Sequence, residues 1–219
     1  MKVKRFFLIG ALVMALFAIA LLTDLPSWNK YRNGDVKDFN TAAAGELKDG
    51  DLVKGKIYVT YGVAVEKEET KKHFGITTSK STTMKYYCVE MENGKRILYG
   101  TSKNDEYGIL DDYARKLEAL YDKYDKDPES VTDSDVPSME LPFEAKVHKL
   151  TGELNNVFAD WYGEGYSSDC EDVYLTKANF DGFQTTVFIG FGLAAGAVIL
   201  LVLFIVFTIK GKKGAQYGY

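Results

Sequence analysis

The chain has 219 residues, of which 46% are hydrophobic and 26% charged, and its formal net charge is −4. Six of the 27 basic residues lie outside residues 24–186, whereas all 31 acidic residues lie inside that segment, which therefore has a net charge of −10. Because an acidic surface repels phosphate backbones and anionic headgroups, the composition argues against nucleic-acid binding and against flat adsorption of this segment to a membrane.

The first predicted element is an apolar helix over residues 6–22, which follows a basic tail at residues 1–5. An uncharged helix of this length nearly crosses the hydrocarbon core, and its internal hydrogen bonds satisfy the backbone in lipid. A cleaved signal peptide is the alternative, because Ala18-Ile-Ala20 loosely matches the small-residue cleavage pattern. The apolar run continues through Leu22, which favours an uncleaved anchor.

Residues 23–50 are mixed in character and are predicted to form a stalk or a first extended segment. The exported domain is predicted to cover residues 51–176. Its first strand lies within residues 51–66, where apolar and other side chains alternate with the period of a half-buried strand. The charged and Ser/Thr-rich residues 66–83 indicate an exposed hairpin end or loop.

A hairpin is predicted where residues 86–91 and 95–100 flank Asn93-Gly94, a dipeptide that accepts the positive φ values of a tight turn. An amphipathic helix of about 20 residues should follow, with Asn104 as its cap and Asp105 and Glu106 in its first turn. Its predicted apolar stripe consists of Leu110, Tyr113, Ala114, Leu117, Leu120, Tyr121 and Tyr124.

The rest of the domain is predicted to contain a linker over residues 126–142, a strand at 143–147, a short helix over 154–162 and a last strand at 173–175. A stem over residues 177–186 leads to a second uncharged run, 187–209. That run is long enough to span a bilayer, and it precedes the basic tail 210–219. The positive-inside rule then places both tails in the cytoplasm and residues 23–186 outside it.

Small residues in both predicted membrane helices favour close helix packing. Gly192 and Gly196 form a G-x-x-x-G motif, and Ala11, Ala15 and Ala18 give the first helix a small face. Such faces let helix backbones approach each other in lipid. We therefore expect helix pairing within one chain or between two copies, and the predicted partners are the lipid bilayer, a second copy or a membrane complex.

Strands and helices occur without regular alternation, so the predicted fold class is α+β. We expect a small antiparallel sheet or a partly open OB-like barrel with two amphipathic helices, flanked by two transmembrane α-helices.

The order of these elements resembles that of uncharacterised two-pass bacterial membrane proteins with an exported domain of unknown function. The resemblance is carried by the strand over 51–66, the Asn93-Gly94 hairpin, the long helix, the segment Phe143-Glu-Ala-Lys-Val147 and the terminal apolar span. It covers most of the chain with generic motifs. It implies a bacterial cell-membrane setting and an OB-like sheet, and it implies no catalytic residues.

Cys88 and Cys170 both lie in the exported segment, where an oxidising compartment would let them form one disulfide. The alternative is two separate thiols, with Cys88 acting as a small apolar residue in a strand.

Metal, cofactor and nucleophile motifs are not found. His73 and His148 have no neighbours at metal-ligand spacing, and the acidic residues 125–136 have Ser130 and Val136 where a calcium loop needs glycine and glutamate. Neither a G-x-S-x-G elbow nor a phosphate-binding glycine loop occurs. We therefore predict no catalytic, cofactor or metal residues.

Two functions remain open. The first is a non-enzymatic binding or accessory module of the cell envelope, and the alternative is a membrane-anchored hydrolase acting on an envelope substrate. A binding module should expose an apolar or aromatic patch, whereas a hydrolase should have a deep cleft with paired carboxylates and shifted pKa values. The absence of an N-x-[ST] acceptor argues against a eukaryotic secretory membrane.

Overall fold

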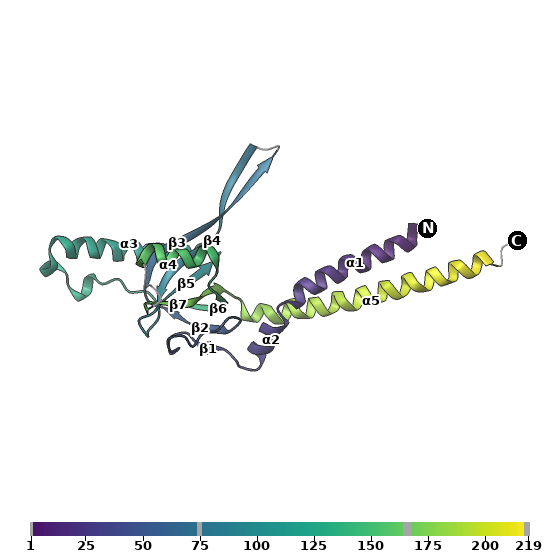
Figure 1. Ribbon diagram of the computed structural model, residues 1–219, viewed down its shortest axis with the longest axis horizontal. Helices are drawn as coiled ribbons and strands as arrows, with labels where there is room; N and C mark the ends of the chain where they lie inside the picture. The colour runs from purple at the N-terminus through teal and green to yellow at the C-terminus, as the bar shows by residue number, and fades with distance from the viewer. Residues whose placement is uncertain (1, 74–75, 164–167, 217–219) are drawn as a thin grey trace. The chain divides into compact units, whose positions relative to one another are not determined.

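The structure is a computed structural model that describes residues 2–73, 76–163 and 168–216. The elements in chain order are α1 (Lys2–Leu22), α2 (Leu25–Arg32), β1 (Lys37–Asp38), β2 (Leu52–Ile57), β3 (Thr60–His73), β4 (Ile76–Glu90), β5 (Arg96–Thr101), α3 (Asn104–Lys126), β6 (Leu141–Lys149), α4 (Gly152–Tyr162), β7 (Cys170–Lys177) and α5 (Phe180–Gln216). They divide into a helical unit, residues 1–34 with 179–219, and a sheet unit, residues 35–178 (Figure 1).

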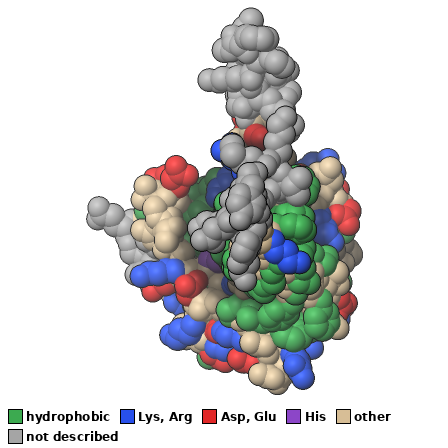
Figure 2. All heavy atoms as spheres, turned by 90° about the vertical axis from the view of Figure 1, so that its right-hand side faces the viewer, with side chains coloured by type: hydrophobic (Ala, Val, Ile, Leu, Met, Phe, Trp, Pro, Cys, Tyr) green, Lys and Arg blue, Asp and Glu red, His purple; other side chains and the backbone are tan. Residues whose placement is uncertain are grey.

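The helical unit contains two helices that are long and apolar enough to cross a membrane, over residues 5–22 and 180–210. Most of their side chains are exposed hydrophobic groups. Figure 2, which is seen from the side on which both chain termini lie in Figure 1, shows hydrophobic side chains gathered on one part of that face. By length and composition, both predicted spans are therefore candidate membrane helices.

Aromatic contacts join α2 to the start of α5 within the helical unit. The rings of Tyr31 and Phe180 lie 5.4 Å apart, those of Trp28 and Phe188 lie 5.9 Å apart, and the Tyr31 hydroxyl donates a 3.0 Å hydrogen bond to Asp181. The sequence analysis missed α2 and assigned its residues to a stalk. It also placed a stem at residues 177–186, where β7 ends and α5 has already begun.

The sheet unit contains one seven-stranded mixed sheet in the order β1-β2-β6-β7-β5-β4-β3. Two neighbouring pairs, β1/β2 and β5/β7, are parallel and the others are antiparallel, so the predicted purely antiparallel sheet is wrong. The sheet is open, since no described pairing joins β3 to the strands at the other end. An OB-like barrel is therefore not shown.

The predicted single strand over 51–66 is two strands, and they lie near opposite ends of the sheet. Only Tyr58 and Val59 separate β2 from β3, so the sheet must curl to bring its two ends together at this point. The alternation seen in the sequence is not kept in space: Ile57 and Val63 pack in one hydrophobic cluster, whereas Tyr61 and Val65 pack against the other, because β3 contains irregular register shifts between Thr60 and Gly62 and between Val63 and Val65. Periodicity alone could not reveal the break.

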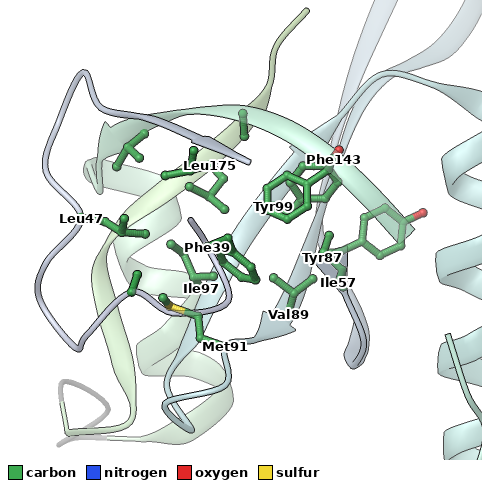
Figure 3. Packing of buried hydrophobic residues seen from close by; sticks show 14 of the residues in the cluster. Phe39, Leu47, Ile57, Tyr87, Val89, Met91, Ile97, Tyr99, Phe143 and Leu175 are labelled. Atoms are coloured by element: carbon green, nitrogen blue, oxygen red, sulfur yellow. The ribbon is translucent and has the colours of Figure 1, made fainter. Parts of the chain in front are cut away.

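One face of the sheet, the inner face, carries the main hydrophobic core (Figure 3). Strands β2, β4, β5, β6 and β7 contribute alternate side chains, and Leu110 of α3 packs against them. Phe39, Ala42 and Leu47 are also buried there, so residues 35–50 belong to the domain rather than to a stalk. The opposite, outer face packs against α4 through Leu154 and Phe158.

The hairpin, both amphipathic helices, the 143–147 strand and the last strand are found where the sequence predicts them. The hairpin uses a three-residue loop: Gly94 has a φ of 81° and its N–H donates to Met91 O at 2.9 Å. Lys103 occupies the N-cap position of α3 without a side-chain capping hydrogen bond, so Asn104 is the first residue of the helix rather than its cap.

Candidate functional site

Arg96 is the centre of a polar cluster on the outer face of the sheet. Its guanidinium carbon lies 5.0 Å from the ring centre of Tyr61 on β3 and 4.7 Å from that of Tyr162 on α4. Stacking on tyrosine rings stabilises a partly desolvated guanidinium. Tyr61 donates a hydrogen bond to the Glu90 carboxylate, and burial followed by this bond raises the pKa of Tyr61 to about 12. Arg96 therefore connects α4 to the sheet through contacts with the rings of Tyr162 and Tyr61. Both tyrosine hydroxyls are protonated, because burial raises the pKa of each.

Both cysteines lie beside this cluster as free, buried thiols. The Sγ of Cys88 lies 3.4 Å from the Tyr162 hydroxyl oxygen. Burial raises the pKa of Cys88, and it raises that of Cys170 to about 11. Because the thiolate is the reactive form, neither cysteine is in the environment of a catalytic nucleophile.

A strand lies between the two cysteines. Cys88 on β4 is opposite Leu98 of β5, and Cys170 on β7 is opposite Arg96 of the same strand. Two strand spacings amount to about 9.5 Å, whereas the Cα atoms of a disulfide lie within about 7 Å. The disulfide that the sequence left open between Cys88 and Cys170 is thus not formed in this structure, where both are free thiols.

A buried carboxylate, Glu106, organises the inner face where α3 begins. This residue is 4% exposed, and it accepts hydrogen bonds from the Tyr99 hydroxyl at 3.0 Å and the Thr101 hydroxyl at 2.6 Å. It also forms an ion pair with Lys177 of β7. Because all its partners are protein groups from β5 and β7, we assign Glu106 the role of fixing α3 on the sheet. The sequence placed it in the first turn but did not reveal its burial.

A groove of about 500 Å³ lies between α3 and β3. Gly62 has a φ of 105°, and a Cβ atom there would lie 3.6 Å from the Ala114 side chain, so the strand passes close to the helix. The groove is lined by Tyr61, Gly62, Val63, Asp111, Ala114, Arg115, Leu117, Glu118, Tyr121 and Asp122.

The aromatic end of α3 adjoins this groove and is uncovered. Leu110, Tyr113 and Leu117 of its apolar stripe are buried, whereas Tyr121 is 54% exposed and Tyr124 is 53% exposed. Figure 1 shows the cause, since the C-terminal half of α3 extends past the strands. The sequence predicted the apolar stripe but did not show where along α3 it is covered.

Three acidic side chains, Asp111, Glu118 and Asp122, and one basic side chain, Arg115, line the groove. Asp111 is held by Lys85 at 3.0 Å and by the Tyr87 hydroxyl at 2.8 Å. Glu118 and Asp122 have no ion pair with any residue in the described ranges, and they are four residues apart on one helix. Like charges at this spacing repel each other and destabilise a helix slightly.

In the described part of the chain, no group of three or more His, Cys, Asp or Glu side chains could hold a metal ion. His148 lies 2.7 Å from the Thr176 hydroxyl oxygen and stacks on Tyr174 with ring centres 5.2 Å apart. Burial lowers its pKa. The His73 side chain lies outside the described residues.

The small residues predicted for helix packing behave differently from one another. A Cβ atom added at Gly196 would meet the end of the Met14 side chain of α1, which would have to move, whereas one added at Gly192 would meet nothing within 4 Å. In α1, Ala11 and Ala18 are buried and Ala15 is half-buried. Thus α1 and α5 contact each other through Gly196 and the alanine face, and Gly192 faces away from α1.

Comparison with known proteins gives no matching family model, no similar curated protein and no similar solved structure.

Proposed function

We propose that residues 35–178 form a protein-binding module held at a membrane by α1 and α5. The observation that carries this proposal is the uncovered aromatic end of α3, where Tyr121 and Tyr124 are each more than half exposed beside a groove. Tyrosine is enriched in protein interfaces because it adds a large apolar area with a polar tip. A partner that covers these two rings would bury the part of the apolar stripe of α3 that the sheet leaves exposed.

The alternative, a membrane-anchored hydrolase, has less support. Lys116 and Arg115 hold the pKa of Asp112 below its usual range, and Lys123 with Thr132 lowers that of Asp135 to about 2. A general acid needs the opposite shift, toward neutral pH. The raised thiol pKa values also disfavour a cysteine nucleophile.

We also propose that the strands of this sheet are arranged in a way that resembles an OB fold. Strand β3 at one end of the sheet follows directly in the chain on β2, which lies next to the end strand β1 at the other end. Strands β5 and β7 pair in parallel, and α3 connects β5 to β6. OB folds bind ligands on the face of their second and third strands. Here α4 covers the outer face of β4 and β5, which favours α3 as the binding surface.

We place the module outside the cytoplasm of a bacterial cell, with both chain termini inside. The basic residues beyond both apolar helices and the resemblance to two-pass bacterial membrane proteins support this orientation. The test is a Ser134→Cys variant labelled on intact cells with a membrane-impermeant maleimide, because Ser134 is exposed whereas Cys88 and Cys170 are buried. Labelling only after lysis would contradict the orientation.

The binding function is tested by crosslinking capture from native membranes with the intact chain as bait. Replacing Tyr121 and Tyr124 by serine should remove the partner that the unmodified chain captures. Tyr58→Ser is the matched control, since Tyr58 is 40% exposed and lies outside the groove. Equal capture by all three baits would refute a role for the aromatic end of α3.

A further inference from the structure

The two long helices of the helical unit reach a common level at Gly190. A Cβ atom added at Gly190 of α5 would lie 3.0 Å from the Leu22 side chain, so the last residue of α1 packs against α5 at this point. Residues 190–209 of α5 are all uncharged and precede the basic tail. At 1.5 Å per residue they span about 30 Å, which equals the thickness of a hydrocarbon core. In a bilayer that both helices cross, Gly190 therefore lies at the edge of the hydrocarbon.

Helix α2 begins three residues after the end of α1 and packs beside the start of α5 (Figure 1). The ring of Trp28 contacts that of Phe188, which precedes Gly190 by two residues, or about 3 Å along the helix axis. The polar headgroups add about 5–7 Å to the hydrocarbon core on each side of a bilayer. The Trp28 ring thus lies at the depth of the headgroups, where tryptophan is enriched in membrane proteins.

The surface around Trp28 on α5 is apolar and open. Phe188 is 55% exposed and Ile189 is 53% exposed, and the exposed apolar surface of α5 continues from them toward its C-terminal end. Trp28 itself is half-buried against this surface. The indole therefore borders a surface that suits acyl chains.

Arg32 brings a cation to the same depth. Its guanidinium carbon lies 5.6 Å from the centre of the Trp28 ring, which is one helical turn earlier in α2. Tyr31 contacts Phe180 at the beginning of α5, so α2 itself leads away from Gly190. The Arg32 side chain folds back along the helix, toward the edge of the hydrocarbon, as helical side chains favour.

The cationic end of α2 is a basic element in an acidic segment. Residues 25–34 contain Lys30 and Arg32 and no acidic residue, whereas residues 24–186 have a net charge of −10. Arg32 is exposed and forms no ion pair with any residue in the described ranges. The Asp181 carboxylate of α5 accepts a hydrogen bond from Tyr31 instead. A guanidinium binds phosphate oxygens through two parallel N–H donors, so a phosphate group at this depth supplies the counter-charge that Arg32 lacks.

We infer that Trp28 and Arg32 form a binding site for the phosphate group of a phospholipid headgroup. The inference rests on the proposed attachment to a membrane and adds a third contact, which fixes the depth at which α1 and α5 sit in the bilayer. The occupant is a phospholipid rather than free phosphate, because the site opens onto the apolar surface of Phe188 and Ile189.

The depth of Trp28 is tested by fluorescence quenching. The chain has two tryptophans, so Trp161→Phe leaves Trp28 as the only indole. This full-length parent chain is inserted into phosphatidylcholine vesicles that carry a nitroxide either on the headgroup or near the end of an acyl chain. The headgroup nitroxide should quench Trp28 more strongly. Stronger quenching from the acyl-chain end, or quenching by neither nitroxide, overturns the inference.

The phosphate contact is tested by comparing phosphatidylcholine with galactolipid vesicles, whose headgroups also have no net charge but contain no phosphate. Acrylamide, a neutral aqueous quencher, should reach Trp28 less in phosphatidylcholine than in galactolipid, because the bound headgroup covers the ring. Arg32→Gln should abolish this difference. The matched control, Lys126→Gln, removes the same charge at an exposed position of α3 and should preserve it. A difference that persists in Arg32→Gln, or its absence from the parent chain, overturns the inference.

Alkaline carbonate extraction of the same vesicles separates this inference from the proposed membrane attachment. If carbonate releases the parent chain, α1 and α5 do not hold it in the bilayer and both proposals fail. If the chain resists extraction while Trp28 lies outside the headgroup layer, the membrane attachment stands and only the phospholipid site is refuted.

Discussion

The Glu106→Ala substitution should be among the most damaging single changes in the sheet unit. It leaves the Tyr99 and Thr101 hydroxyls without their acceptor and Lys177 without its counter-charge. The Glu106 side chain is 6% exposed and that of Lys177 is 19% exposed, so solvent compensates little. Breaking a buried pair from one side costs about 3–5 kcal/mol, which corresponds to a fall of about 10 °C or more in the unfolding midpoint.

The assay is thermal unfolding of the full-length chain in detergent, followed by near-ultraviolet circular dichroism of the packed tyrosines. Asp112→Ala is the control, because Asp112 forms solvent-exposed pairs with Arg115 and Lys116 that contribute little. A Glu106→Leu/Lys177→Met double variant should recover part of the loss, since it removes both buried charges. If Glu106→Ala lowers the midpoint no more than Asp112→Ala does, Glu106 does not hold α3 on the sheet.

Three further predictions use the same preparation. Because burial lowers the pKa of His148 in the folded state, protonation favours unfolding, so the free energy of unfolding should decrease as the pH falls below about 6.5. His148→Gln should remove that part of the decrease in a denaturant titration. Cys88 and Cys170 should react slowly with a thiol reagent in the native protein and rapidly after unfolding, and rapid native labelling would contradict their burial. Gly196→Leu should lower the melting midpoint in detergent, whereas Gly192→Leu, in open space, should not.

The two long apolar helices could be predicted from the sequence because their cause is local. An apolar run that satisfies its own backbone hydrogen bonds needs no distant partner to form a helix. The same holds for the loop at Gly94, for α3 and for α4, each of which is marked by turn chemistry or by helical periodicity within a few residues. The predicted start of α3 differs from the observed one by a single residue, since Asn104 was expected at the N-cap position that Lys103 occupies.

The order of the strands could not be predicted, because it depends on pairing between distant segments. Strands β2 and β3 share one alternating pattern, yet four other strands lie between them in the sheet. The burial of Phe39 and Leu47, which were assigned to a stalk, likewise depends on the strands that cover them. A period of two shows that a strand has a buried face but does not show which strand lies beside it.

The sequence by itself determined the two apolar helices, the acidic segment between them and the local elements of that segment. The tertiary structure decided which side chains of those elements are covered. It buried Glu106 between α3 and the sheet and placed β5 between Cys88 and Cys170. It left Tyr121 exposed because the C-terminal half of α3 extends past the strands. Periodicity gives the direction in which a side chain points, whereas burial requires a second surface, and only the folded chain supplies that surface.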